Sequence, residues 1–147
     1  MIRPATPDDL PALLEMGQAF NTEAGYSETA PFDPASFERT ASVLGNAGRL
    51  MVADNGSGAI GMAAFDMGVA ICNYEVRPAR EAFWYVQPDH RRGLGRQMLS
   101  ALELQAKASG AHFLDVVAES GKRSEALARI YRAAGYIPTE IVFRKWI

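Results

Sequence analysis

The densest group of residues able to bind an anion lies in the segment 86–96, whose sequence is VQPDHRRGLGR. Its glycines let backbone N–H groups approach an anion closely, and its arginines can add charge-assisted hydrogen bonds. A helix that starts here would contribute unpaired N–H donors and the positive end of its dipole. The pattern suits a pyrophosphate group. The residues that we expect to contact it are Arg91, Arg92, Gly93, Leu94, Gly95 and Arg96.

These residues also have a simpler interpretation, in which glycine and arginine form the turn and keep it soluble. The spacing excludes two other phosphate-binding loops. The segment lacks the Gly-Lys-Ser/Thr of a P-loop, and Gly93-Leu94-Gly95 has no third glycine where a dinucleotide-binding fingerprint needs one.

Two strongly patterned elements flank the arginine-rich turn. Residues 82–86 are aromatic and β-branched and are soon followed by Pro88, which predicts a central strand buried on both faces. From Gly93 to Gly110 apolar residues recur at spacings of three and four, which predicts a long helix. The turn therefore lies between a buried strand and a helix.

The remaining elements follow from capping, periodicity and turn signals. Thr6-Pro7 and Asp33-Pro34 predict the starts of two helices, which end near Gly25 and within 46–48. Apolar runs at 50–53 and 60–67, joined by a glycine-rich loop, predict a hairpin. A strand at 112–118, a helix over residues 127–134 and a last strand at 141–146 complete the order ααβββαβαβ.

Composition limits the classes of function. A chain of 147 residues fits one domain, so we expect residues 1–147 to form a single unit. A net charge of -2 gives no general attraction to nucleic acid or to an anionic membrane. No apolar stretch resembles a signal peptide or a membrane span, so we expect a cytoplasmic protein. One cysteine, Cys72, and two histidines make a metal site unexpected.

The turn and the order of the elements resemble the GNAT acetyltransferase superfamily. The pyrophosphate motif of that family reads Gln/Arg-x-x-Gly-x-Gly/Ala, and Gly93 and Gly95 match its glycines. The segment 126–136 resembles the family's second motif, and the segments 81–86 and 135–140 are most similar to its phage-type branch. His90 takes the Gln/Arg place, and the turn is one residue shorter than usual.

The resemblance implies an α/β (α+β) fold of three layers. Its mixed, mostly antiparallel sheet splays apart between strands four and five, and helices cover both faces. The implied activity is transfer of an acetyl group from acetyl-CoA to a primary amine, by direct attack in a ternary complex. Trp84, Tyr85 and Val86 would lie beside the pantetheine arm, and the Val86 N–H would polarise the thioester carbonyl. Ser124 would touch the CoA arm, or it would only cap a helix.

The resemblance also implies an acid and a base. Tyr131 matches the family's tyrosine acid, which protonates the departing thiolate; as an apolar-face residue it is equally a core tyrosine. Glu81 matches the position of a glutamate base, and its alternative is a strand-end carboxylate paired with Arg77 or Arg80.

The acceptor amine is not identified by the sequence. The loops 21–33 and 70–80, which flank the acceptor channel in such a fold, carry charges of both signs. A small molecule or a peptide both fit, and the C-terminal strand offers a sheet edge for a homodimer. A non-catalytic CoA-binding module of the same fold is the alternative function.

Overall fold

The structure is a computed structural model that describes residues 1–119 and 124–147. The chain forms two compact units, Met1–Val117 and Ala118–Ile147. Each unit is described by itself below.

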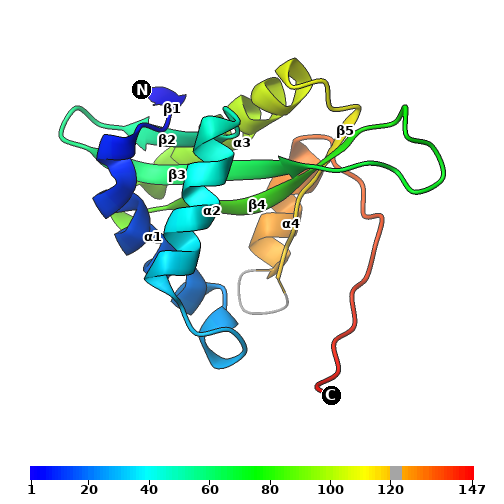
Figure 1. Cartoon of the computed structure of the whole chain (residues 1–147), viewed down its shortest axis with the longest axis horizontal. Helices are drawn as coiled ribbons and strands as arrows, with labels where there is room; N and C mark the ends of the chain where they lie inside the picture. Colours follow the sequence, from blue (N-terminus) through cyan, green and yellow to red (C-terminus); the bar gives the residue numbers. More distant parts are fainter. Residues whose placement is uncertain (120–123) are drawn as a thin grey trace. The chain divides into compact units, whose positions relative to one another are not determined.

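A five-stranded sheet in the order β1-β2-β3-β4-β5 forms the centre of the first unit (Figure 1). The strands are β1 (Ile2–Pro4), β2 (Leu50–Asp54), β3 (Ala59–Met67), β4 (Pro78–Val86) and β5 (Phe113–Asp115). All neighbours pair antiparallel except β4 and β5, which are parallel. The mixed, mostly antiparallel sheet is confirmed. The short edge strand β1 was not predicted, because three residues that include a proline carry too little pattern.

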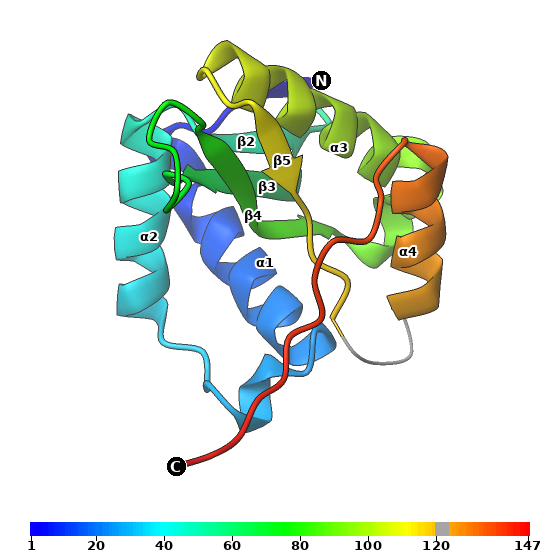
Figure 2. The same cartoon turned by 90° about the vertical axis from the view of Figure 1, so that its right-hand side faces the viewer.

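Three helices of the first unit cover the two faces of this sheet (Figure 2). They are α1 (Leu10–Glu23), α2 (Pro34–Asn46) and α3 (Arg91–Ala108). Apolar residues of α1 and α2 form one buried cluster with Val52, Met62 and Tyr85, and those of α3 form a second with Phe65 and Val86. The predicted helical layers on both faces are confirmed.

Local signals explain where these helices begin and end. A 3-10 turn, Pro7–Asp9, precedes α1, and Gly25 follows it with a φ of 77° that ends the helix. The carboxylate of Asp33 accepts a hydrogen bond from the Ser36 N–H at 3.0 Å and so caps α2. A second 3-10 turn, Tyr26–Glu28, lies between the two helices.

A β-bulge at Ala82 changes which residues of β4 face each helical layer. Glu81 pairs with Phe65 and Phe83 pairs with Ala64, so Ala82 is an extra residue with no partner in β3. Residues paired across an antiparallel ladder share a face. Glu81 therefore lies on the α3 face with Phe65, whereas Phe83 and Tyr85 pack on the α1 face. This bulge was not predicted.

The sheet opens between β4 and β5. The two strands pair only at Pro78–Arg80 with Phe113–Asp115, and β4 then continues to Val86 without β5 beside it. The predicted splay is thus present, and the predicted strand at 112–118 is only three residues long.

A partly buried ion-pair network joins the N-terminal strand to the start of α1. The guanidinium of Arg3 donates to both oxygens of Asp9 at 2.8 Å and to Asp54 at 2.7 Å. Asp9 is 7% exposed and also accepts the Thr6 N–H at 2.7 Å. The hydrogen bonds from Arg3 lower the pKa of Asp9 from 3.8 to about 2.

The second unit contains one helix, α4 (Ser124–Ala133), followed by a turn at Gly135 with a φ of 92°. The strand predicted at 141–146 is wrong, because this segment is irregular and pairs with no strand in the described residues. Phe143 is 90% exposed and Val142 72%. β-branched and aromatic residues favour an extended backbone, but a strand also needs a neighbour to complete its hydrogen bonds.

Candidate active site

The turn between β4 and α3 bends sharply at two residues. A 3-10 turn, Pro88–His90, leads into α3, but Arg92 has a ψ of 81° and Gly93 a φ of 83°. Regular helical geometry therefore begins only after Gly93, and the left-handed conformation there suits glycine. Gly93 and Leu94 head the helix, where backbone N–H groups have no intrahelical acceptor.

Close packing fixes the first turn of α3 against the sheet. A Cβ atom on Gly95 would lie 3.2 Å from the Trp84 ring, and one on Gly61 would lie 2.7 Å from the Met98 sulfur. Glycine at these positions lets the helix approach β3 and β4. Trp84, predicted to lie beside the cofactor, is thus a packing residue beneath the turn.

Arg91 is directed into the protein. Its Nε donates to the Val86 carbonyl at 2.8 Å, and its terminal nitrogen donates to Glu23 of α1 at 2.8 Å. Its guanidinium carbon also lies 5.4 Å from the centre of the Tyr85 ring. Arg91 therefore connects the turn, the end of β4 and α1.

The two other arginines of the turn remain available. Arg92 and Arg96 are exposed, and neither forms an ion pair with any residue that the structure describes. The three arginines that the sequence grouped together thus divide into one structural contact and two exposed cations at the start of a helix.

The open edge of β4 exposes backbone groups of alternate residues. The Gln87 N–H donates to the Ile60 carbonyl at 3.0 Å, and the register aligns Tyr85 with Met62. Because alternate residues of an antiparallel strand turn their backbone groups toward the partner, those of Tyr85 face β3 and those of Trp84 and Val86 face the opening. The sequence grouped Tyr85 with Val86 as backbone contacts, and the register separates them.

Glu81 lies at the point where β4 and β5 separate. It is half-buried, and its Oε2 accepts a hydrogen bond from the Val117 N–H at 3.2 Å. The carboxylate thus links β4 to the segment that follows β5, where the ladder between the strands has ended.

Tyr131 and Ser124 belong to the second unit. Tyr131 is 7% exposed on α4, and its ring centre lies 5.8 Å from that of Tyr136. Its carbonyl accepts the Tyr136 N–H at 3.0 Å, which folds the chain back at the end of the helix. Ser124 is the first residue of α4 and is half-buried.

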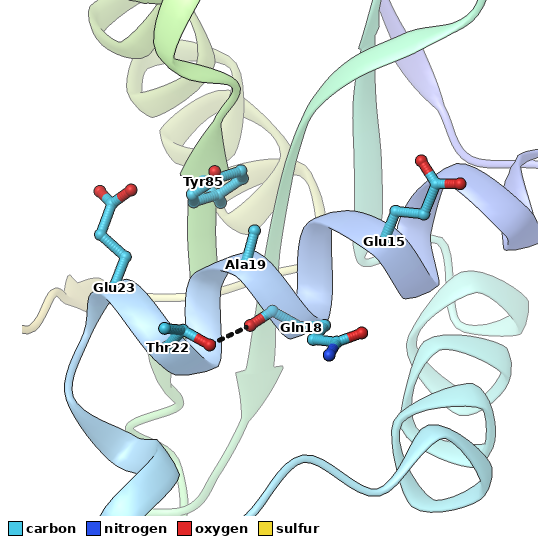
Figure 3. A pocket seen from close by; sticks show the side chains of 6 residues that line it. All are labelled: Glu15, Gln18, Ala19, Thr22, Glu23 and Tyr85. Atoms are coloured by element: carbon cyan, nitrogen blue, oxygen red, sulfur yellow. Dashed lines mark hydrogen bonds between the residues drawn. The ribbon is translucent and has the colours of Figure 1, made fainter.

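A cavity of about 490 Å³ lies on the α1 side of β4. Its lining residues come from one face of α1 and from β4, and Figure 3 shows them: Glu15, Gln18, Ala19, Thr22, Glu23 and Tyr85. The predicted acceptor loop 21–33 contains two of these residues, Thr22 and Glu23, whereas the earlier part of this face of α1 was not predicted. Its signal was the recurrence of polar residues at 15, 18, 22 and 23, the helical spacing.

The part of the chain that the structure describes contains neither a metal-binding cluster nor a helix that could span a membrane. No group of three or more histidine, cysteine or acidic side chains among them could hold a metal ion. Every helix in residues 1–119 and 124–147 is too short or too polar to serve as a membrane span.

The family described as "Acetyltransferase (GNAT) family" matches residues 13–136 of the chain. A search of curated proteins finds no match.

Solved structures with the same fold cover nearly the whole chain. A predicted acetyltransferase from Clostridium acetobutylicum with acetyl-CoA shares 18% identity and a TM-score of 0.74, covering 99% of this chain and 94% of that one. AAC(6')-Iy in complex with the bisubstrate analog CoA-S-monomethyl-acetylneamine shares 16% identity and a TM-score of 0.74, with 100% and 98% covered. An acetyltransferase from Trypanosoma brucei shares 18% identity and a TM-score of 0.71, with 100% and 99% covered. At these identities the likeness shows the fold.

Proposed function

Because the chain belongs to the GNAT family of acetyltransferases, we propose that it transfers the acetyl group of acetyl-CoA to a primary amine of a small molecule. In this proposal residues 1–147 act as one acetyltransferase domain, and the amine attacks the thioester directly in a ternary complex. The observation that carries the proposal is the bend at Arg92 and Gly93, which opens the start of α3 beside the unpaired edge of β4.

The turn fits the pyrophosphate of acetyl-CoA. Gly93 and Leu94 present backbone N–H groups at a helix start, where the dipole favours an anion. Arg92 and Arg96 are exposed beside them and supply charge-assisted donors. Main-chain donors do not depend on side-chain type, so His90 in the Gln/Arg place leaves this contact intact. We assign Arg91 to positioning of the turn, since its donors already bind Val86 and Glu23.

The opening between β4 and β5 fits the pantetheine arm. Amides of an extended chain can pair with the Trp84 backbone groups and the Val86 N–H that face this opening, as a further strand would, while the Val86 carbonyl already accepts from Arg91. The Val86 N–H would then lie at the thioester end of the arm. A donor aimed at the thioester oxygen stabilises the negative charge that develops there during attack.

Acetyl-CoA supplies an acetyl group on a thiol leaving group, and the protein manages the protons. The amine nitrogen forms a bond to the acetyl carbon as the bond from this carbon to sulfur breaks. The nitrogen loses a proton and the thiolate gains one. We propose Glu81, directly or through water, as the base and the Tyr131 phenol as the acid. Ser124 is proposed as a contact to the CoA arm.

Calorimetric titration with acetyl-CoA, CoA and ATP tests the proposal. We expect acetyl-CoA and CoA to bind in preference to ATP, and a double variant Arg92→Ala, Arg96→Ala to bind acetyl-CoA about tenfold more weakly. The matched control, Arg39→Ala with Lys107→Ala, removes two exposed charges from α2 and from the last turn of α3. Absence of acetyl-CoA binding, or an equal loss in the control, would refute the assigned site.

Amine-dependent release of the CoA thiol then tests catalysis. Release that requires both acetyl-CoA and an amine supports the enzyme. Tight binding of acetyl-CoA with no release across a broad amine panel would instead support the non-catalytic CoA-binding module.

A further inference from the structure

The cavity between α1 and Tyr85 has a chemistry that selects among amines. We propose that it binds an acceptor with at least two basic nitrogens, with the reacting amine at the Tyr85 end and a second cation at Glu15. This inference rests on the proposed function, because it names the class of amine that this acetyltransferase would accept. None of the described residues that line the cavity is basic, and two of these six residues carry carboxylates.

The two carboxylates are in different electrostatic states. Glu23 is already balanced by Arg91 at 2.8 Å. Glu15 is exposed and forms no ion pair with any residue in the described part of the chain. The unbalanced negative charge of the cavity therefore lies at Glu15. An acceptor with a carboxylate or phosphate beside its amine would meet repulsion there, and one with a second ammonium group would gain a partner.

At the other end of the cavity the Tyr85 hydroxyl is available to bind a ligand. It is 7% exposed, and its hydroxyl makes no hydrogen bond with any residue that the structure describes. The hydroxyl is not among the side-chain polar atoms that are closed off from solvent, so it can donate to or accept from a ligand in the cavity. The aromatic ring also attracts a cation, as the position of Arg91 beside it already indicates.

The spacing of these groups sets the length of the acceptor. Glu15 and Glu23 are eight residues apart on α1, which corresponds to about 12 Å along a helix axis. Figure 3 shows the Tyr85 ring near Glu23 and Ala19, with Glu15 farther along the same helix. Tyr85 directly precedes Val86, whose backbone faces the opening of the sheet. A linear triamine such as spermidine places its terminal nitrogens at a comparable separation, whereas a short monoamine reaches only one end.

The test compares spermidine with n-butylamine and with alanine, in direct calorimetric titration and in thiol release. We expect spermidine to bind best and to have the highest kcat/KM. Glu15→Gln should weaken spermidine binding about fivefold and raise the KM for spermidine more than the KM for n-butylamine. The advantage of spermidine should shrink as salt is added. Glu38→Gln, which removes an exposed carboxylate from α2, serves as the matched control.

The outcomes separate this inference from the proposed function. If acetyl-CoA binds and amines release thiol, but spermidine is no better than n-butylamine or Glu15→Gln changes nothing, the inference is overturned and the acetyltransferase stands. If no amine releases thiol, the direct titrations still decide whether the cavity prefers the triamine.

Discussion

Replacing Gly93 with alanine separates the backbone geometry of the turn from the general stability of the protein. Gly93 has a φ of 83° and Gly110, just beyond the other end of α3, has a φ of 84°. A Cβ atom at Gly93 meets nothing within 4 Å, and one at Gly110 meets only the end of the Arg77 side chain at 3.5 Å. The two substitutions therefore impose the same backbone strain, and about 25 Å of helix separates the two sites.

The size of the effect follows from this strain. A residue with a Cβ in the left-handed conformation destabilises the folded protein by about 1–2 kcal/mol. Alanine also lowers the conformational entropy of the unfolded chain, which offsets about 0.4–1 kcal/mol of this loss. We therefore expect each variant to lose about 1 kcal/mol of stability, or about 2–4 °C in Tm. At Gly93 relief of the strain also turns the N–H donors at the start of α3. Loss of one such bond to a charged group should weaken acetyl-CoA binding about tenfold or more.

Thermal unfolding and calorimetric titration with acetyl-CoA measure the two effects on both variants. The expected result is an equal fall in Tm, with weaker acetyl-CoA binding in Gly93→Ala alone. Equal acetyl-CoA affinity in both variants would show that the bend at Gly93 does not position the cofactor and would refute the reasoning.

Three further predictions concern single side chains. Arg91→Ala should lower the free energy of unfolding by about 1–2 kcal/mol, since it removes a hydrogen bond, an ion pair and a ring contact. Arg92→Ala should change the free energy of unfolding by less than about 0.5 kcal/mol. Denaturant unfolding compares the two variants, and equal losses would contradict the different roles assigned to Arg91 and Arg92. Tyr131→Phe should lower kcat about tenfold or more and leave acetyl-CoA binding intact, so an unchanged kcat would exclude the phenol as the acid. The pKa of Asp9 is lowered to about 2 in the folded protein, so its contribution is present above pH about 4 and is lost as pH falls toward 2. Asp9→Asn should flatten the dependence of stability on pH in this window, which acid unfolding would reveal; an unaltered acid limb would contradict the role of the Arg3 ion pair.

The sequence predicts the scaffold of the site well because strong local signals coincide there. Proline and a capping residue mark the starts of α1 and α2, the aromatic run marks β4, and Gly110 ends α3. Each of these signals depends on only a few neighbouring residues, so it can be interpreted without knowledge of tertiary contacts.

The features that the sequence did not predict depend on contacts between residues that are far apart in the chain. The segment 141–146 has the composition of a strand, but composition does not supply a neighbouring edge. Arg91 differs from Arg92 and Arg96 because Glu23, distant in sequence, lies within reach of it. Only the part of the cavity lining that lies within residues 21–33 was predicted, because the rest combines a face of α1 with Tyr85, a residue whose pattern indicated only a core strand.

The bulge at Ala82 has a consequence for the path of the proton that the amine must lose. An amine bound beside Tyr85 is on the α1 side of the sheet, whereas Glu81 is on the α3 side. A hydrogen-bonded ladder is a barrier to water, and the ladder between β4 and β5 ends beyond Arg80, next to Glu81. In the proposed reaction, with Glu81 as the base, a proton from an amine bound beside Tyr85 would therefore pass through the gap between the strands, carried by water. In that reaction β4 would lie between the acceptor and the base, and the gap beside β4 would connect the two sides of the sheet.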